Sequence, residues 1–200
     1  MGLITGAGFC PLLDSVKKKL AIEEVKDTER VLGIIKEETK RTLNDWRTYP
    51  QIESWIEQTG WIFSYTTLLN DQPLLRVAVF HPSLSKDRHV TYGEGDPAII
   101  FPVELGSETT QVIRDSMLNR ITIPKDSTEL QASIAQNSAA IAELIAALQP
   151  HCPSISRRIQ VGIHSGGQTG ISDIIDIPRD GTFSLSIKMT GPSRERAYTE

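Results

Sequence analysis

The sequence predicts an α+β fold in which helices and antiparallel strands occupy separate stretches of the chain. Apolar residues recur with the 3.6-residue period of helices in residues 12–46 and again in residues 130–148. Apolar and polar residues alternate, as in strands, over residues 61–80 and after Pro153. We therefore expect a helical N-terminal segment, an antiparallel β region, a central alanine-rich helix resembling a coiled coil, and a small C-terminal antiparallel sheet.

Length and composition place the chain among globular proteins. Its 200 residues are 39% hydrophobic and 23% charged, which suits a sizeable buried core. A formal net charge of -4 argues against a dedicated binder of nucleic acid or acidic membranes. No apolar run approaches the roughly 18 residues that a membrane helix needs, and the N-terminus lacks the basic region of a signal peptide. We expect no membrane span, no signal peptide and no nucleic-acid partner.

Residues 1–11 are small and apolar, and we predict a flexible or loosely docked N-terminal arm. The segment LITGAGF, Leu3 to Phe9, resembles the opening of a dinucleotide-binding fingerprint and the nucleotide loop of sirtuin-like proteins. A working fingerprint also needs a longer strand and a third glycine, whose place is taken here by Pro11. The resemblance implies an alternative function, a nucleotide-binding enzyme or regulator that uses Gly6 and Gly8.

Residues 12–124 are predicted to form an α+β domain that begins with helices. The helical period over residues 12–46 indicates one long helix or two helices joined near Asp27. Its opposite face interleaves lysines and glutamates, including Glu37 and Glu38, and is expected to be solvated. A short helix over residues 51–58 should follow.

Strands are expected next in this domain. WIFSYTTLL and LLRVAVF flank a polar turn at residues 70–72, which predicts a β-hairpin. A short strand should follow at residues 89–92. The run AIIFPVEL contains Pro102, which restricts it to an edge strand or a bulge. A helix from Ser107 to about Leu118, with Ser107 as N-cap, completes the domain.

The central helix is predicted to span Leu130 to Leu148 within a region of residues 125–149. Asp126 and Glu129 have the spacing of a capping box at its start, and prolines follow its end. Two sets of residues repeat every seven positions, as in a coiled-coil seam. The expected oligomer interface consists of Leu130, Ile134, Asn137, Ile141, Leu144, Ile145 and Leu148.

Two features of this helix favour a coiled coil of three helices over one of two. Isoleucine and leucine at the seam positions favour a dimer, whereas the wider apolar face at Ile145 and the polar Asn137 favour a trimer, with Asn137 marking the register. The segment from Ile134 to Leu144 resembles the stalks of trimeric phage fibres and trimeric adhesins. A seam of about three heptads also fits a helix buried within its own domain, which remains the alternative.

Residues 150–200 are predicted to form a small β domain with a frayed tail. Three alternating runs indicate about three antiparallel strands separated by the turn signals SGGQTG and PRDGT. A sheet of this size is near the lower limit of independent stability. The domain should therefore need another surface to pack against.

No set of residues in the sequence specifies a reaction. The four histidines, at positions 81, 89, 151 and 164, lack the spacing of a zinc site, and Cys10 and Cys152 are isolated free thiols. The run HSGGQTG could cradle a phosphate only if a helix followed, and alternating isoleucines follow instead. We expect no metal, no cofactor and no catalytic residues.

These patterns together predict a structural or attachment protein of a viral or bacteriophage particle, such as a tail-fibre component. It would act through self-association and contacts with other structural subunits, in the virion or the host cytoplasm. Besides the nucleotide-binding alternative, a monomeric soluble interaction module with the central helix packed inside fits the same patterns.

Overall fold

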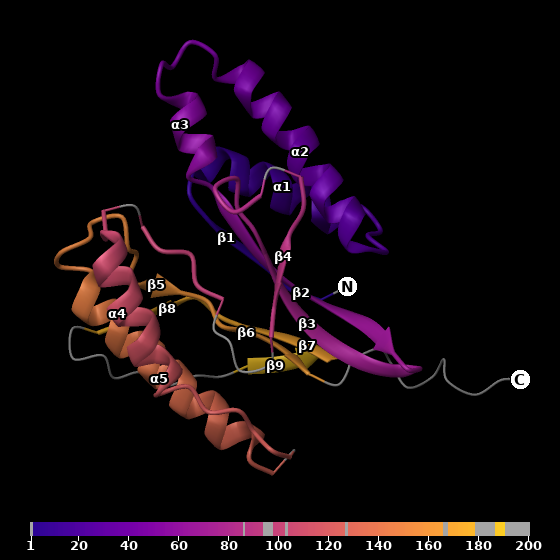
Figure 1. Cartoon of the computed structure of the whole chain (residues 1–200), viewed down its shortest axis with the longest axis vertical. Helices are drawn as coiled ribbons and strands as arrows, with labels where there is room; N and C mark the ends of the chain where they lie inside the picture. The colour runs from indigo at the N-terminus through magenta and orange to yellow at the C-terminus, as the bar shows by residue number, and fades with distance from the viewer. Residues whose placement is uncertain are drawn as a thin grey trace, which may run out of the picture. The chain divides into compact units, whose positions relative to one another are not determined.

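A computed structural model describes residues 2–85, 87–93, 98–102, 104–126, 128–165, 168–178 and 187–190 of the chain (Figure 1). The described residues contain both helices and antiparallel sheets, which confirms the predicted α+β class. The chain divides into two compact units. The first comprises Met1–Glu94 with Ala98–Ile100, and the second comprises Gly95–Pro97 with Phe101–Glu200.

The first unit contains a four-stranded antiparallel sheet. Its strands lie in the order β1 (Ile4–Ala7), β2 (Gly60–Leu69), β3 (Gln72–Phe80) and β4 (Val90–Tyr92). The predicted hairpin is confirmed by the pairing of β2 with β3 from Trp61↔Phe80 to Leu69↔Gln72. Asn70 and Asp71 form its turn with φ of 51° and 62°, a left-handed conformation that Asn and Asp tolerate.

Three helices of the first unit supply the other half of its core. They are α1 (Cys10–Ile22), α2 (Thr28–Asp45) and α3 (Ile52–Glu57). The helical region is thus two helices and not one, because the Asp27 side chain caps α2 by accepting a 2.7 Å hydrogen bond from the Arg30 N–H. Val16 and Ile34 are buried with Trp61 and Phe63, and each such side chain contributes about 1.5–3 kcal/mol.

The prediction of an N-terminal arm at residues 1–11 was wrong. Residues 4–7 form β1, which pairs with β2 from Ile4↔Phe63 to Ala7↔Gly60, and α1 begins at Cys10. Leu12 and Leu13 then enter the core. The cause is non-local, because β1 is stabilised by a strand more than 50 residues further along the chain.

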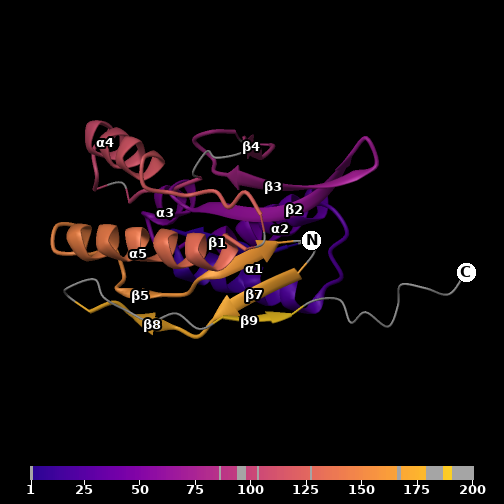
Figure 2. The ribbon, with the colours of Figure 1, turned by 90° about the horizontal axis from the view of Figure 1, so that it is seen from below.

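The second unit contains two helices and two small antiparallel sheets in the part of it that the structure describes. The helices are α4 (Ser107–Leu118) and α5 (Leu130–Leu148), and the bounds of α5 match the prediction. One sheet pairs β5 (Arg158–Ile159) with β8 (Ile175–Asp176). The other has the order β6 (Gly162–Ser165), β7 (Gln168–Ser172), β9 (Ile187–Thr190). The C-terminal part of α5 lies beside β5 in both views (Figures 1 and 2).

Three further predictions differ from the structure. The expected boundaries at residues 124–125 and 149–150 do not separate compact units, since α4, α5 and the C-terminal strands share one unit. Residues 98–102 form no strand; instead the Ile100 side chain packs over Gly60, where an added Cβ would lie 3.0 Å from it. The N-cap of α4 is Gly106, one residue before the predicted Ser107. The predicted frayed tail lies outside the described residues.

Candidate functional site

The helix α5 carries the seven residues predicted to form an oligomer interface, and none of the seven is fully buried within the chain. Ile141 is 41% exposed, and the other six are half-buried. The residues of α5 that are fully buried are all small, namely Ser133, Ser138, Ala140 and Ala142. This reverses the usual pattern, in which a helix turns its largest aliphatic side chains into its own core.

The position of each residue around the helix axis explains this pattern. With 3.6 residues per turn, Ile134, Ile141 and Ile145 fall on one narrow line along α5. Leu148 continues that line, and we call these four residues the aliphatic stripe. Ser133 and Ala140 are buried on one side of the stripe, and Ser138 and Ala142 are buried on the other. The helix is therefore covered on two flanks, while the stripe between them stays partly open to solvent.

Asn137, the expected register mark, binds within its own chain. Its Oδ1 accepts hydrogen bonds from the backbone N–H of Thr122 at 2.8 Å and from the Thr122 hydroxyl at 3.2 Å. Its Nδ2 donates to the Thr122 carbonyl at 2.9 Å. The amide thus acts like one step of a β-ladder, holding the segment that precedes α5 against the helix.

The charge on α5 is also satisfied locally. Glu143 is the only charged residue between Leu130 and Leu148, and it pairs with Arg120 from the same preceding segment. At the start of the helix, Asp126 accepts from the N–H groups of Thr128 at 2.8 Å and Glu129 at 3.2 Å. The Glu129 carboxylate accepts in turn from the Lys125 N–H at 3.0 Å, one residue earlier than a standard capping box requires.

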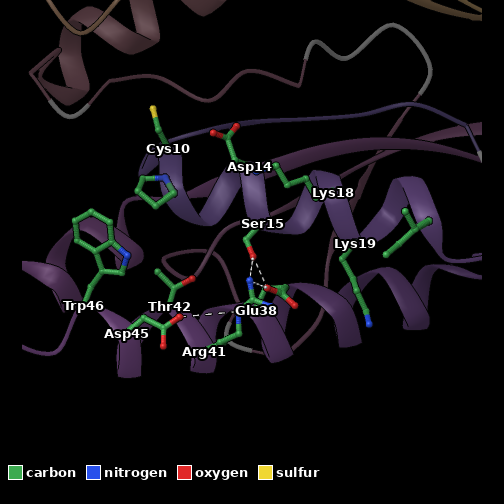
Figure 3. A pocket seen from close by; sticks show the side chains of 12 residues that line it. Cys10, Asp14, Ser15, Lys18, Lys19, Glu38, Arg41, Thr42, Asp45 and Trp46 are labelled. Carbon is green, nitrogen blue, oxygen red and sulfur yellow. Dashed lines mark hydrogen bonds and ion pairs between the residues drawn. The ribbon is translucent and has the colours of Figure 1, made fainter.

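A surface groove of about 550 Å³ lies between α1 and α2 in the first unit (Figure 3). At its floor Ser15 donates a hydrogen bond to Glu38, and Arg41 contacts both, at 2.8 Å from the Ser15 hydroxyl and 3.2 Å from the Glu38 carboxylate. Glu38 is only 6% exposed. Sequence reasoning placed it on the solvated face of the helix, although its spacing from Ile35 and Thr42 follows the buried side of α2.

The side chains of Ser15, Glu38 and Arg41, here called the triad, account for the burial of a charged carboxylate. The Ser15 oxygen accepts a hydrogen bond from Arg41 with one of its two lone pairs, while its proton is directed to Glu38. Figure 3 shows the three side chains turned toward one another and the Cys10 thiol pointing away from them. The groups at the floor of the groove therefore satisfy each other, and the triad explains how Glu38 is tolerated inside the unit.

The glycines of the nucleotide-like segment are explained by close packing. A Cβ at Gly6 would lie 2.7 Å from Leu13 Cδ2, and a Cβ at Gly8, whose φ is +130°, would lie 2.5 Å from Thr59 Cα. The Phe9 N–H donates to the Thr59 hydroxyl at 2.9 Å. The surface that a phosphate would approach in a dinucleotide fingerprint is occupied here by Thr59, and the sheet is antiparallel.

The remaining candidate ligands and nucleophiles are not brought together. Cys10 is exposed, Cys152 is buried, and the described residues contain no group of three or more side chains suited to hold a metal ion. His164 lies in β6, which pairs with β7 from Gly162↔Ile171 to Ser165↔Gln168, so the described residues of the run HSGGQTG lie in paired strands and not before a helix. Within the described part of the chain, no helix is long and apolar enough to cross a membrane.

Comparison with models of protein families, with curated proteins and with solved structures gave no match.

Proposed function

We propose that the chain is a structural subunit that associates with copies of itself through the aliphatic stripe of α5. The observation that carries this proposal is the partial exposure of the stripe between two buried flanks, with Ile141 at its centre 41% exposed. Covering a seam of this kind with a second helix stabilises the association by roughly 25 cal/mol for each Å² of apolar surface removed from water.

The partner is a second copy of the chain because the stripe repeats every seven residues and carries no charge. A seven-residue repeat is self-complementary, since equivalent helices can interlock their side chains along it. The single charged residue of α5, Glu143, falls on the helix face opposite the stripe and is paired with Arg120, so like charges do not oppose each other across the seam. We propose a trimer over a dimer on the wider apolar face at Ile145, since Asn137 is engaged within its own chain. We propose a role in a viral or bacteriophage particle on the likeness of this segment to fibre stalks.

The test compares two charged variants on opposite faces of α5. Ile141→Asp places a carboxylate in the stripe at an exposed position, so the single chain tolerates it while the interface does not. Ala139→Asp places the same charge at an exposed position on the far side of the helix. Analytical ultracentrifugation should show association through the stripe, expected as a trimer, for the parent chain and for Ala139→Asp, and loss of that trimer for Ile141→Asp.

Three results would contradict the proposal. A parent chain that stays monomeric up to high micromolar concentration would leave the stripe without a partner. Equal effects of the two charged variants would mean that association does not depend on the stripe. Unchanged mass, combined with a large loss of stability in Ile134→Asp, would favour the monomeric interaction module instead.

A further inference from the structure

The β2–β3 hairpin extends beyond both of its neighbouring strands. On one side, β1 pairs with β2 only up to Phe63. The last backbone hydrogen bonds on this side run from the Gly2 N–H to the Ser64 carbonyl and from the Ser64 N–H to the Leu3 carbonyl. On the other side, β4 pairs with β3 only over residues 77–79. We call the remaining part of the hairpin, residues 65–76, the arm; it includes the tip where β2 and β3 meet (Figure 1).

The arm exposes leucines on both of its faces. Leu68 is 69% exposed and Leu69 is 55% exposed, and because successive strand residues point to opposite faces, these two lie on different sides. Leu75 is 42% exposed and shares the face of Leu68, since Leu68 pairs with Pro73 and Thr66 with Leu75. A hairpin that only had to be solvated would gain nothing from aliphatic side chains at these positions.

The register shows which backbone groups of the arm face outward. In a hairpin with a two-residue turn, the residues that flank the turn, here Leu69 and Gln72, bond to each other. Bonding pairs then alternate with pairs whose N–H and C=O groups point away from the partner strand. Leu68 and Thr66 therefore direct these groups to the outer edge of β2. Ser64, two residues earlier, bonds to Leu3 and Gly2 on that same edge, as the alternation requires.

The two edges of the arm differ. On β3 the outward positions include Pro73, which has no N–H group and so interrupts any strand that would pair there. On β2 the outward positions are Thr66 and Leu68, and no described strand pairs with them. Proteins commonly protect an exposed edge with proline or charge, and only the β3 edge is protected in this way.

We propose that two copies of the chain pair their arms antiparallel along the β2 edges, around a two-fold axis at Thr67. Thr66 of one copy then lies opposite Leu68 of the other, and the outward N–H and C=O groups of both residues bond across the axis. The Leu68 side chains of the two copies then lie on the same face of the joined sheet.

Two observations identify the occupant as a second copy. The free edge is bounded by the end of β1 pairing at Ser64 and by the turn at Asn70, and Thr67 is its midpoint. The free edge of a second copy therefore pairs with it in antiparallel order over its full length. The whole of β2, GWIFSYTTLL, contains no charged residue, so two β2 strands meet without charge repulsion. This contact uses different residues from the stripe of α5 and does not depend on it. A chain with both contacts can link into an extended assembly.

The test uses the Ile141→Asp background, in which association through α5 is removed. Thr66→Pro deletes an outward N–H on the β2 edge and leaves the hydrogen bonds to β3 intact. Leu75→Pro is the matched control, because Leu75 is the cross-strand partner of Thr66 and its outward N–H lies on the other edge. Amide hydrogen exchange at Leu68 and sedimentation are measured for all three chains over a hundredfold range of concentration, and circular dichroism verifies folding.

The proposal expects a concentration-dependent dimer and exchange at Leu68 that slows on the order of tenfold as the dimer fills. Thr66→Pro should lose both effects, and Leu75→Pro should keep both. The proposal is overturned if the Ile141→Asp chain stays monomeric at every concentration, a result that leaves the α5 proposal intact. It is also overturned if Leu75→Pro loses the dimer as Thr66→Pro does, or if the dimer forms without protection at Leu68.

Discussion

Asn137 and Thr122 are joined by a two-way exchange of hydrogen bonds, 2.8 Å from the Thr122 N–H to Oδ1 and 2.9 Å from Nδ2 to the Thr122 carbonyl. A polar residue at a seam position of a coiled coil is usually explained by pairing with equivalent residues in other helices. Here the side chain fixes the approach to α5 within one chain. The helix is therefore held in place before any second copy binds.

Asn137→Leu should destabilise the single chain by about 1–3 kcal/mol, because the N–H and C=O of Thr122 lose their partner in a partly buried position. Gln136→Leu, at the exposed neighbouring position, is the control and should change stability by less than about 0.5 kcal/mol. Urea unfolding in the Ile141→Asp background measures both. If Asn137→Leu were stabilising there, as leucine at a seam position of a free coiled coil is, the intrachain role of Asn137 would be wrong.

The parts of the fold that were predictable are those whose signal is local. The seven-residue spacing from Ile134 to Leu148 and the alternation around Asn70 predict α5 and the hairpin, because each pattern lies within the element that it describes. The strand β1 was missed because its partner begins at Gly60, more than 50 residues away. The burial of Glu38 has a local signal in the helical spacing of α2, but its partner Ser15 lies in another helix and could not be deduced from that spacing.

The candidate site was predictable only in part, for the same reason. The heptad spacing locates the aliphatic stripe, but it gives no measure of how much of Ile141 the rest of the chain covers. The partner of Asn137 could not be deduced, since any nearby backbone offers the same donor and acceptor. The free edge of β2 follows from where β1 and β4 stop pairing, which is a property of the assembled sheet.

Ser15 and Glu38 should be energetically coupled. A double-mutant cycle with Ser15→Ala and Glu38→Ala is expected to give a coupling energy between about 0.5 and 3 kcal/mol, because the two side chains share a hydrogen bond at a buried carboxylate. The matched cycle with Arg41→Ala and Asp45→Ala tests an exposed pair at 4.0 Å and should give less than about 0.5 kcal/mol. Chemical denaturation of the parent chain and the six variants measures both cycles, and equal coupling in the two would contradict the assignment.

Gly8→Ala and Gly33→Ala should have opposite effects on stability. At Gly8 a methyl group meets Thr59 at 2.5 Å with the backbone at φ +130°, which should cost about 2–4 kcal/mol. At Gly33, inside α2, the nearest atom is Arg30 Nη1 at 3.4 Å, and alanine should stabilise the helix by roughly 0.5–1 kcal/mol. Thermal unfolding of the two variants checks both signs. If Gly8→Ala left the stability unchanged, the backbone at Gly8 would not pack against Thr59 as the structure has it.

His89 should make the first unit less stable as the pH falls. Its ring lies against Phe63 at 5.4 Å and Tyr65 at 5.9 Å, and its buried Nδ1 has no hydrogen-bond partner. Burial lowers the pKa of His89 below its ordinary value of 6.5, opposed by the negative charge of Glu29 on α2. Among the nearby charges, Lys36 of α2 and Asp87 of the same loop pair with each other, at 3.4 Å.

The sign of the effect follows from proton linkage. A histidine whose pKa is lower in the folded chain binds its proton more tightly when unfolded, so its stabilising contribution is present above pH 6.5 and is lost as the pH falls through the folded pKa. His89→Phe keeps the ring contacts and removes the titration, so the acid loss of stability below pH 6.5 should be smaller than in the parent chain. Burial also lowers the pKa of His81, so the parent chain and His89→Phe should both still lose some stability at acid pH. Urea unfolding between pH 5 and 8 measures the two profiles, and parallel profiles would show that His89 does not contribute.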